Sequence, residues 1–299
     1  MAVPQPGIFA QGTRSHYHLE FDLRAGVTDE QIRSALCGLR EPPVTAGGSN
    51  IVVGFGAALW RWLEPDAAPA ALAPFEPIEG DGRRAPATQH DIWVWSHGTG
   101  EDIELDVARG VAAALAPVAT LAAEQSCFVY RDGRDLTGFI DGTENPSVEA
   151  AHDVAIVPDL ERGAGGSFVL AQKWVHDLGA FHAQSQAEQE ATIGRTKPDS
   201  IERDDKPPTA HISRVVIEEA GEELEIYRRS TPFGTVGKLG LYFLAFSADP
   251  TRFTKMMARM FGTAGDGLHD HLTDFTRPVS GAFYFAPALD DLDGLLPGD

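Results

Sequence analysis

Hydrophobic and polar residues in the first half of the chain follow two different periods. Residues 17–23 (YHLEFDL) alternate between apolar and polar positions, which predicts a half-buried strand. Thr28 and Gln31 have the spacing of a capping box, and the pattern after them predicts a helix that extends to Leu39. Further segments are predicted as strands at 51–55, 91–96 and 126–130, a helix at 105–115 and a long surface loop at 64–88. The predicted order is strand, helix, strand, strand, helix, strand.

The second half of the chain repeats this order after a glycine-rich, acidic connection at 132–166. Ser185 and Glu188 form a second capping box, which opens a helix that ends near Gly194. The other elements predicted there are strands at 167–175, 211–217, 224–228, 239–246 and 281–285, and a helix at 250–261. Because both halves have the βαββαβ order, we predict an α+β protein of two ferredoxin-like halves with antiparallel sheets, residues 1–145 and 146–299.

The chain carries far more acidic than basic side chains. Its 44 Asp and Glu residues and 24 Lys and Arg residues give a formal net charge of −20. Nucleic-acid binding depends on clustered basic side chains, and an anionic membrane surface repels an acidic protein, so we expect neither partner. Cys37 and Cys127 are the only cysteines, and the sequence contains no leader-like segment and no run of about 18 apolar residues. We therefore expect a soluble, cytoplasmic protein.

The first candidate for chemistry is an acidic turn at residues 138–146 (GFIDGTENP). Glycines near Asp141 let the backbone approach a flat ligand closely and leave the carboxylate uncrowded. An ordinary Asp-Gly turn is the alternative, although Phe139 and Ile140 are unusual residues for a solvated turn. Asp141 is therefore a candidate site residue.

The second candidate is His211, which opens the predicted strand at 211–217. A lone histidine near apolar residues is more often a hydrogen-bonded core residue than a ligand. Imidazole nevertheless suits a haem iron or another borderline metal, provided that a carboxylate or carbonyl fixes its second nitrogen. Asp274, in the apolar string 272–275, is a candidate partner, although the sequence alone does not show that the two residues meet.

The third candidate is a pair of arginines, Arg228 and Arg229, at a strand end before a turn that contains proline and glycine. A solvated strand edge is the alternative interpretation for both.

Two pairs of histidines, His16 with His18 and His269 with His271, could also bind a metal. The sequence lacks the residues that would complete a zinc site with either pair, so we prefer a structural role for both pairs.

Taken together, these three strings resemble the dye-decolorizing peroxidases, and the match is closest to the B-type, unexported subgroup. Residues 138–142 fit that family's G-x-x-D-G motif, His211 resembles its haem ligand, and Arg228, 17 positions later, matches its distal arginine. The resemblance extends over nearly the whole chain, through the segments 5–7, 86–91, 172–177, 193–196 and 274–287. It implies a duplicated ferredoxin-like fold with one haem b per chain, bound in the C-terminal half.

Carried over to this sequence, the resemblance implies a role for each candidate residue. His211 would be the fifth ligand of the haem iron, and Asp274 would be its hydrogen-bonded partner. Asp141 and Arg228 would lie over the opposite face of the haem. Arg195 would pair with a haem propionate.

The implied function is that of a haem peroxidase, which reduces hydrogen peroxide through a ferryl intermediate and oxidises phenolic compounds or dyes in one-electron steps. Asp141 would move the peroxide proton and Arg228 would stabilise the departing oxygen, which predicts greatest activity at acidic pH. Some members of the family have Asn at the position of Ser230, and serine is a shorter donor. How a bound peroxide or water is held at this position is therefore not decided by the resemblance. A haem-processing protein that releases iron, or a haem carrier, is the alternative; a carrier has no need of Asp141 and Arg228.

The resemblance also implies partners. Hydrogen peroxide and small aromatic electron donors are the expected substrates, and an even-numbered homo-oligomer is the expected assembly. The chain ends at 290–299, soon after the last predicted strand, so we do not expect it to be an encapsulin cargo. Five aromatic residues could carry electrons to bulky dyes, but packing in the core is the preferred interpretation for each of Trp93, Trp95, Trp174, Tyr227 and Tyr242.

Overall fold

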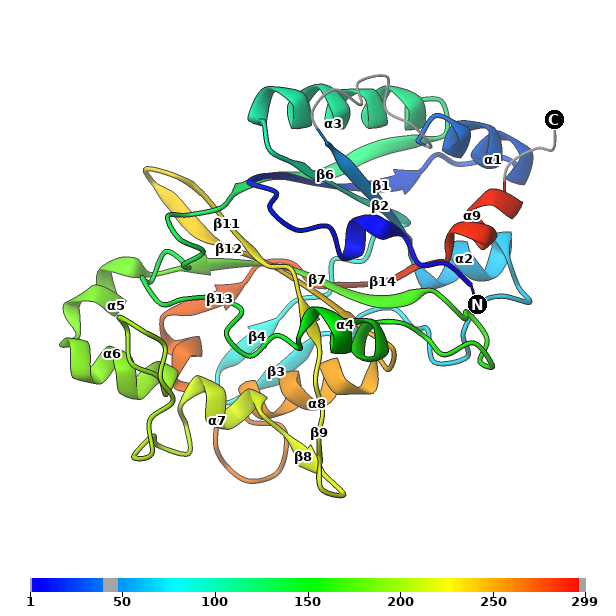
Figure 1. Cartoon of the computed structure of the whole chain (residues 1–299). Coiled ribbons are helices and arrows are strands. Elements are labelled where there is room, and N and C mark those ends of the chain that lie inside the picture. Colours follow the sequence, from blue (N-terminus) through cyan, green and yellow to red (C-terminus); the bar gives the residue numbers. More distant parts are fainter. Residues whose placement is uncertain (1, 40–47, 296–299) are drawn as a thin grey trace.

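The computed structural model describes residues 2–39 and 48–295, and its framework is one large antiparallel sheet (Figure 1). The strands of the first half are β1 (Ser15–Leu23), β2 (Asn50–Phe55), β5 (Ile92–Gly98) and β6 (Ala119–Phe128). They lie side by side in the order β2-β5-β1-β6. Helices α1 (Asp29–Cys37) and α3 (Glu101–Leu115) follow β1 and β5 along the chain, so this half has the predicted βαββαβ order.

The second half has the same topology. Its strands are β7 (Ser167–His176), β10 (Tyr227–Arg228), β12 (Lys238–Ser247) and β14 (Ala282–Ala286), in the order β10-β12-β7-β14. Three helices stand between β7 and β10, and a fourth stands between β12 and β14: α5 (Leu178–Ala183), α6 (Gln186–Ile193), α7 (His211–Val215) and α8 (Thr251–Met260). In both halves the sheet order is therefore second, third, first and fourth strand, and the predicted fold class is confirmed.

The two halves join where β14 pairs with β2, at Phe285 and Phe55. Side chains from both halves also meet in a buried aromatic cluster. His18 of β1 stacks on Tyr242 of β12 with 3.7 Å between ring centroids, and Glu20 of β1 accepts hydrogen bonds from Tyr242 and from Tyr284 of β14. The two halves are therefore packed as one body.

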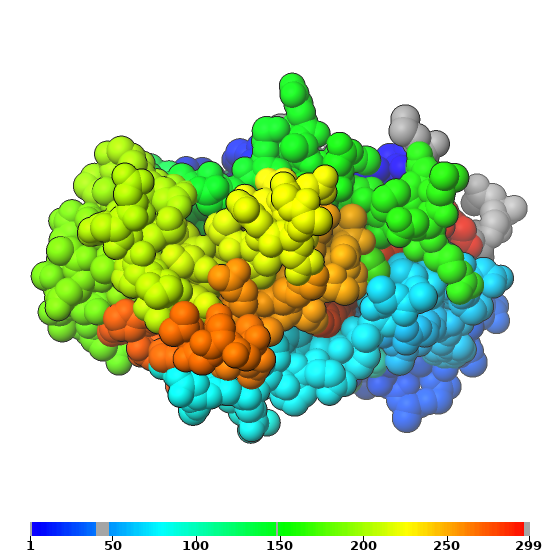
Figure 2. Space-filling view, turned by 90° about the horizontal axis from the view of Figure 1, so that it is seen from below, coloured from blue at the N-terminus to red at the C-terminus, as the bar shows by residue number. Residues whose placement is uncertain are grey.

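Shorter elements complete the described chain. They are η1 (Pro6–Ile8), α2 (Ala57–Leu63), β3 (Ile78–Gly80), β4 (Arg83–Ala85), α4 (Val148–Ala155), β8 (Glu218–Glu219), β9 (Glu222–Glu223), β11 (Thr231–Thr235), η2 (His271–Asp274), β13 (Thr276–Pro278) and α9 (Leu289–Gly294). Figure 2 shows the face on which the yellow β8–β9 hairpin lies against the orange α8, where Lys255 and Glu219 form an ion pair. Within the described ranges, no helix combines the length and the apolar character that crossing a membrane requires.

Both predicted capping boxes are present. Thr28 caps α1 and exchanges hydrogen bonds with Gln31, and Ser185 caps α6 in the same way with Glu188. Helix α6 is followed by Gly194, whose φ of 95° is a left-handed conformation that glycine adopts without strain.

Three predictions of secondary structure were wrong. Residues 211–215 form the short helix α7, because tertiary contacts override the strand pattern: the buried Arg214 donates to Asp266 and to the carbonyl of Arg259. The connection at 132–166 contains α4, capped by Ser147. The segment 64–88, predicted as a loop throughout, contains the β3–β4 hairpin.

Candidate functional site

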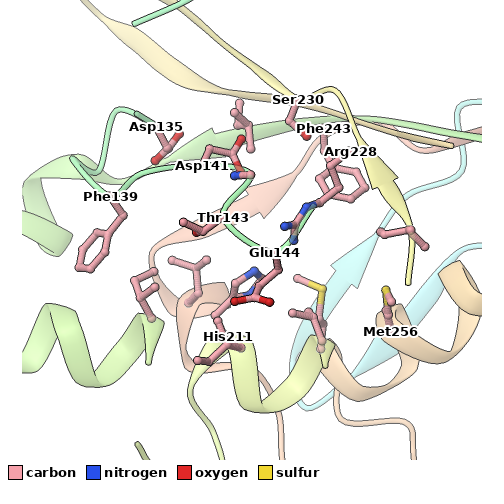
Figure 3. A pocket seen from close by; sticks show the side chains of 18 of the residues that line it. Asp135, Phe139, Asp141, Thr143, Glu144, His211, Arg228, Ser230, Phe243 and Met256 are labelled. Atoms are coloured by element: carbon pink, nitrogen blue, oxygen red, sulfur yellow. The ribbon is translucent and has the colours of Figure 1, made fainter. Parts of the chain in front are cut away.

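A cavity lies between one face of the second-half sheet and the helices α7 and α8 (Figure 3). Its lining residues among the described part of the chain all fall between Asp135 and Thr276. The walls are largely apolar, with side chains from β7, β12 and α8. They are Leu170, Trp174, Leu241, Phe243, Met256, Met257 and Met260. Such a lining suits a flat, apolar ligand.

His211 stands at the start of α7, and its ring points into the cavity (Figure 3). Its Nδ1 atom lies 2.6 Å from Oδ2 of Asp270, a carboxylate with no exposed surface. The other oxygen of Asp270 accepts from the backbone N–H of Leu272, so the carboxylate is fixed. This arrangement orients the imidazole and leaves Nε2 as the atom that can bind a metal in the cavity.

The predicted pairing of His211 with Asp274 was wrong. Asp270 caps the start of the 3₁₀ helix η2, and Asp274 is the last residue of that helix. The carboxylate of Asp274 binds Arg83. The two aspartates stand at opposite ends of η2, and only Asp270 faces His211. Asp270 was missed because it stands between two histidines in a polar string, where an acidic residue normally faces solvent.

Asp141 and Arg228 lie on the opposite side of the cavity from His211 (Figure 3). The loop of Asp141 turns tightly, with left-handed glycines at 138 and 142, and Oδ1 of Asp141 accepts from the N–H of Gly142 at 2.7 Å. Asn145 links this loop to β10, because its side chain donates to the carbonyl of Arg228 and accepts from the N–H of Arg228. The structure therefore brings together two strings that are far apart in the sequence.

The charges around Asp141 act on its pKa in opposite directions. Loss of water raises this pKa above its ordinary value, the guanidinium of Arg228 opposes the rise, and the carboxylate of Asp135 adds to it. The net effect is a raised pKa. Nε of Arg228 is buried and has no hydrogen-bond partner among the described residues, so this side chain has capacity for a ligand.

Ser230 also lines the cavity, two residues after Arg228. Its hydroxyl oxygen accepts a hydrogen bond from the N–H of Leu244 at 3.3 Å. The hydroxyl proton remains for another acceptor.

Arg195 follows the end of α6 and also lines the cavity. Its guanidinium binds the carboxylate of Glu144 and lies 3.5 Å from that of Glu202. Nε of Arg195 is buried without a partner in the part of the chain that the structure describes. This guanidinium therefore binds a carboxylate in the cavity wall and has one donor left over.

The five aromatic residues considered for electron transfer are all buried: Trp93, Trp95, Trp174, Tyr227 and Tyr242. All five therefore pack in the interior, and Trp174 also lines the cavity. The absence of an electron-transfer role stays a prediction. His16 and His18 stack on Trp95, and no group of three metal-binding side chains occurs within residues 2–39 and 48–295.

Asp135 and His176 line the cavity as well, and sequence reasoning missed both. They form a pair with 3.1 Å between Oδ1 of Asp135 and Nε2 of His176. His176 belongs to the segment 172–177, one of the strings that resemble the peroxidase family, whereas no signal in the sequence pointed to Asp135.

A duplicated ferredoxin-like fold in which one histidine faces an aspartate and an arginine across an apolar cavity is what a redox protein with a flat cofactor would require. Two family models match the chain, the Dyp-type peroxidase N-terminal model at residues 5–129 and the C-terminal model at residues 132–291. The chain therefore belongs to the Dyp-type peroxidase family, and it is an enzyme of the peroxidase class.

Individual relatives agree with this assignment. The chain is 37% identical over 303 residues to a dye-decolorizing peroxidase of Rhodococcus erythropolis, covering 98% of this chain and 89% of the relative. Among solved structures, a variant of DypB from Rhodococcus jostii RHA1 in complex with heme is 32% identical, with a TM-score of 0.92 over 98% of this chain and 99% of that one.

One further solved structure bears on assembly. The encapsulated DyP-type peroxidase from Mycobacterium smegmatis is 34% identical, with a TM-score of 0.91 and coverage of 99% of both chains. Encapsulation is a property of that protein, and our expectation that the present chain is not an encapsulin cargo stays a prediction.

Proposed function

We propose that the cavity binds one haem b per chain and that the protein is a haem peroxidase, which reduces hydrogen peroxide and oxidises phenolic compounds or dyes by one-electron steps. The observation that carries this proposal is the arrangement of three side chains around one apolar cavity. His211 faces it from one side, while Asp141 and Arg228 face it from the other (Figure 3).

The residues present fit a haem. The imidazole of His211 is fixed through Nδ1 by the buried Asp270, which is the usual support of a metal-binding histidine. The apolar walls and the methionines of α8 suit a porphyrin ring. Arg195 already holds a side-chain carboxylate, that of Glu144, so it has the chemistry to hold a propionate. His211 would bind the iron and Arg195 would bind the propionate.

When bound, the haem would supply an iron that takes up the oxidising equivalents of hydrogen peroxide and passes them to the electron donor. Asp141 would accept the proton from the near oxygen of hydrogen peroxide and return it to the oxygen that leaves as water. Arg228 would stabilise the negative charge that develops on that leaving oxygen. Ser230 would orient the peroxide or a water through its free hydroxyl proton.

A haem-processing protein would share this cavity but would give different products. We therefore test the proposal with purified protein that has been loaded with haem. The expected result is a Soret absorption band that is lost or shifted in His211→Ala, together with peroxide-dependent oxidation of a phenol. A protein that binds no haem would refute the proposal, and release of free porphyrin and iron would support haem processing instead.

The cellular setting is also a proposal. Cys37 and Cys127 are both free thiols, the first exposed and the second buried, which agrees with a reducing compartment such as the cytoplasm. A homo-oligomer of even number stays a prediction, and light scattering of the purified protein measures it directly.

A further inference from the structure

The loop at residues 133–142, which carries Asp141, is anchored by two basic side chains that none of the roles given above uses. They are Arg134, which belongs to the loop, and Lys197, which lies in the segment that follows α6. Both line a depression that shares Thr137 with the cavity, and neither of them lines the cavity itself. Any effect of these two side chains on the site must therefore pass through the loop.

The guanidinium of Arg134 holds three backbone carbonyls together. It donates to the carbonyl of Gly138, within the loop, at 2.9 Å, and to the carbonyls of Lys197 and Pro198, outside the loop, at 2.8 Å and 3.0 Å. Its Nε atom pairs with Asp132 at 3.0 Å, and the side chain is 17% exposed. The planar fork of an arginine can serve several acceptors at once, so this one side chain joins the loop to the segment after α6.

The ammonium of Lys197 supports the same loop. It donates to Oε1 of Gln189 at 2.5 Å and lies over the rings of Phe139 and Phe181, at 5.4 Å and 5.9 Å from their centroids. A cation is attracted to the face of an aromatic ring, and the attraction is stronger where water is excluded. Phe139 is 5% exposed and lines the cavity, so Lys197 lies against a residue of the cavity wall.

Gly138 allows this close approach of the lysine. Its φ of 93° is in the left-handed region, and a Cβ atom added to it would lie 2.7 Å from Cε of Lys197. The first glycine of the G-x-x-D-G motif therefore leaves room for the lysine side chain as well as for the turn. The position of that side chain and the position of the loop backbone depend on each other.

The loop between these anchors and Asp141 is closed by its own hydrogen bonds. The N–H of Asp135 donates to the carbonyl of Phe139, and the N–H of Gly138 donates to the carbonyl of Asp135, both at 2.9 Å. The N–H of Asp141 donates to the carbonyl of Gly133 at 3.1 Å. Because the loop is closed in this way, a shift of Gly138 or Phe139 is passed on to Asp141.

The segment after α6 also contacts the opposite side of the cavity. Gly194, the first residue after α6, packs against α7, since a Cβ atom added to it would lie 2.5 Å from Cγ1 of Ile212. Ile212 follows His211 in the chain and also lines the cavity. One short segment, from Gly194 to Lys197, therefore touches both the loop of Asp141 and the helix of His211.

We propose that Lys197 and Arg134 are positioning residues of this site. They fix the loop of Asp141 on the segment that also supports His211, and so they set where the Asp141 carboxylate lies across the cavity from His211. Neither side chain would touch the peroxide. Loss of either would leave the cavity in place but would let the carboxylate move away from the point at which it takes up a proton. The inference rests on the function proposed above.

The first test is Lys197→Met, which keeps a long side chain against Gly138 but removes the ammonium. We expect the haem-loaded variant to react with hydrogen peroxide about 10- to 100-fold more slowly, because a displacement of about 1 Å at a reacting group can cost about 100-fold. Lys197→Arg keeps a cation and a donor, and it should recover most of the rate. Lys255→Met is the matched control, since its ammonium also donates at 2.5 Å, to Glu219, but lies on α8.

A second measurement separates the position of the base from general damage to the site. Hydrogen cyanide must lose a proton when it binds to the iron, whereas nitric oxide has none to lose. We expect Lys197→Met to slow cyanide binding by the same factor as the reaction with peroxide, and to change nitric oxide binding by less than about twofold. Equal losses for the two ligands would show that the lysine only supports the fold, and would overturn the inference.

A double-mutant cycle tests whether the lysine acts through Asp141. Lys197→Met made in an Asp141→Asn background should have no further effect on the rate with peroxide, because the base that the lysine positions is already absent. Arg134→Gln should behave in the same way in its own cycle with Asp141→Asn. A full additional loss in the Asp141→Asn background would contradict the proposal.

Hydrogen exchange in the loop gives a readout that does not need haem. The N–H groups of Gly138 and Asp141 are hydrogen-bonded within the loop, and both should exchange faster in Lys197→Met than in the wild type. Should that variant fail to fold, exchange in the wild type decides the question, and loop N–H groups that exchange as fast as those of an exposed turn refute the proposal. A wild type that binds no haem would instead refute the proposed function, and the exchange measurement would still apply to the loop.

Discussion

Nδ1 of His211 lies 2.6 Å from Oδ2 of Asp270, and this contact joins the start of α7 to the residue that caps η2. The carboxylate has no exposed surface, so it accepts the imidazole proton in surroundings that strengthen the bond. A histidine held in this way is a more basic ligand than a free imidazole.

We predict that Asp270→Asn will retain haem but will lower the rate of peroxide consumption about 10- to 100-fold, the usual cost of removing the partner of a metal-binding histidine. The rate of the first reaction with peroxide, followed by absorption, measures this. Asp274→Asn is the control, because Asp274 is 34% exposed and binds Arg83. Equal losses in the two variants would contradict the assignment of Asp270.

The pH dependence of the reaction with hydrogen peroxide should follow the ionisation of Asp141. Asp141 acts as a base only when it is ionised, and its pKa is raised by loss of water, so the rate should fall as the pH drops through this raised value rather than near the ordinary 3.8. We expected activity to be greatest at acidic pH. The raised pKa of Asp141 adds that activity should fall again once the pH drops below that pKa. A rate that continues to rise down to pH 3 would exclude Asp141 as the base.

Arg228 should determine the pH below which the reaction with peroxide slows, because it acts on the pKa of Asp141. Its guanidinium lowers the pKa of Asp141 against the effect of burial, so Arg228→Leu should move the acidic side of the profile to higher pH as well as slow the reaction. Arg228→Lys keeps the charge and should leave the profile closer to that of the wild type. Stopped-flow measurements from pH 3 to pH 8 would separate these results.

Arg195 and Glu144 should have opposite effects on retention of haem. A hydrogen bond to a charged group is worth about 1.5–3 kcal/mol, so Arg195→Leu should speed the loss of haem about tenfold or more. Glu144→Gln weakens the competitor for the same guanidinium and should slow the loss of haem. Transfer of haem to an excess of an acceptor protein measures both rates. Arg203→Leu, at an arginine that pairs with Asp205 and Glu190 outside the cavity, is the control.

Buried histidines between the two halves should make the fold sensitive to acid. Burial lowers the pKa of His16 to about 3 and that of His97 to about 2, and it also lowers the pKa of His18. Each ring is neutral when folded and protonated when unfolded, so each removes about 1.4 kcal/mol of unfolding free energy per pH unit as the pH falls from 6.5 toward its folded pKa.

We therefore predict that His18→Phe will reduce the slope of unfolding free energy against pH by about 1.4 kcal/mol per unit between pH 6 and pH 4. Phenylalanine can keep the stacking on Tyr242, and the two ring nitrogens that it removes have no partners in the described chain. Urea unfolding at several pH values gives the slope. His152→Phe is the control, since its side chain is 55% exposed, and an equal change there would contradict the prediction.

The sequence predicted the topology well because its signals are local. The capping boxes at Thr28 and Ser185 and the alternating strand at 17–23 are decided by neighbouring residues, and the structure contains all of them. The helix at His211 and the pairing with Asp270 depend on contacts across the fold, with α8 and with η2. A short apolar string has the same appearance as a strand or as a buried helix, so its state could not be predicted from its own residues.

The two halves share one topology, yet the described residues that line the cavity all come from Asp135 onward. The loop that carries Asp141, at the end of the first half, is therefore the part of that half that lines the cavity. Outside that loop, the first half contacts the second through the buried aromatic cluster and through the pairing of β2 with β14. Substitutions on the outer surface of the first half should therefore leave the geometry of the cavity unchanged.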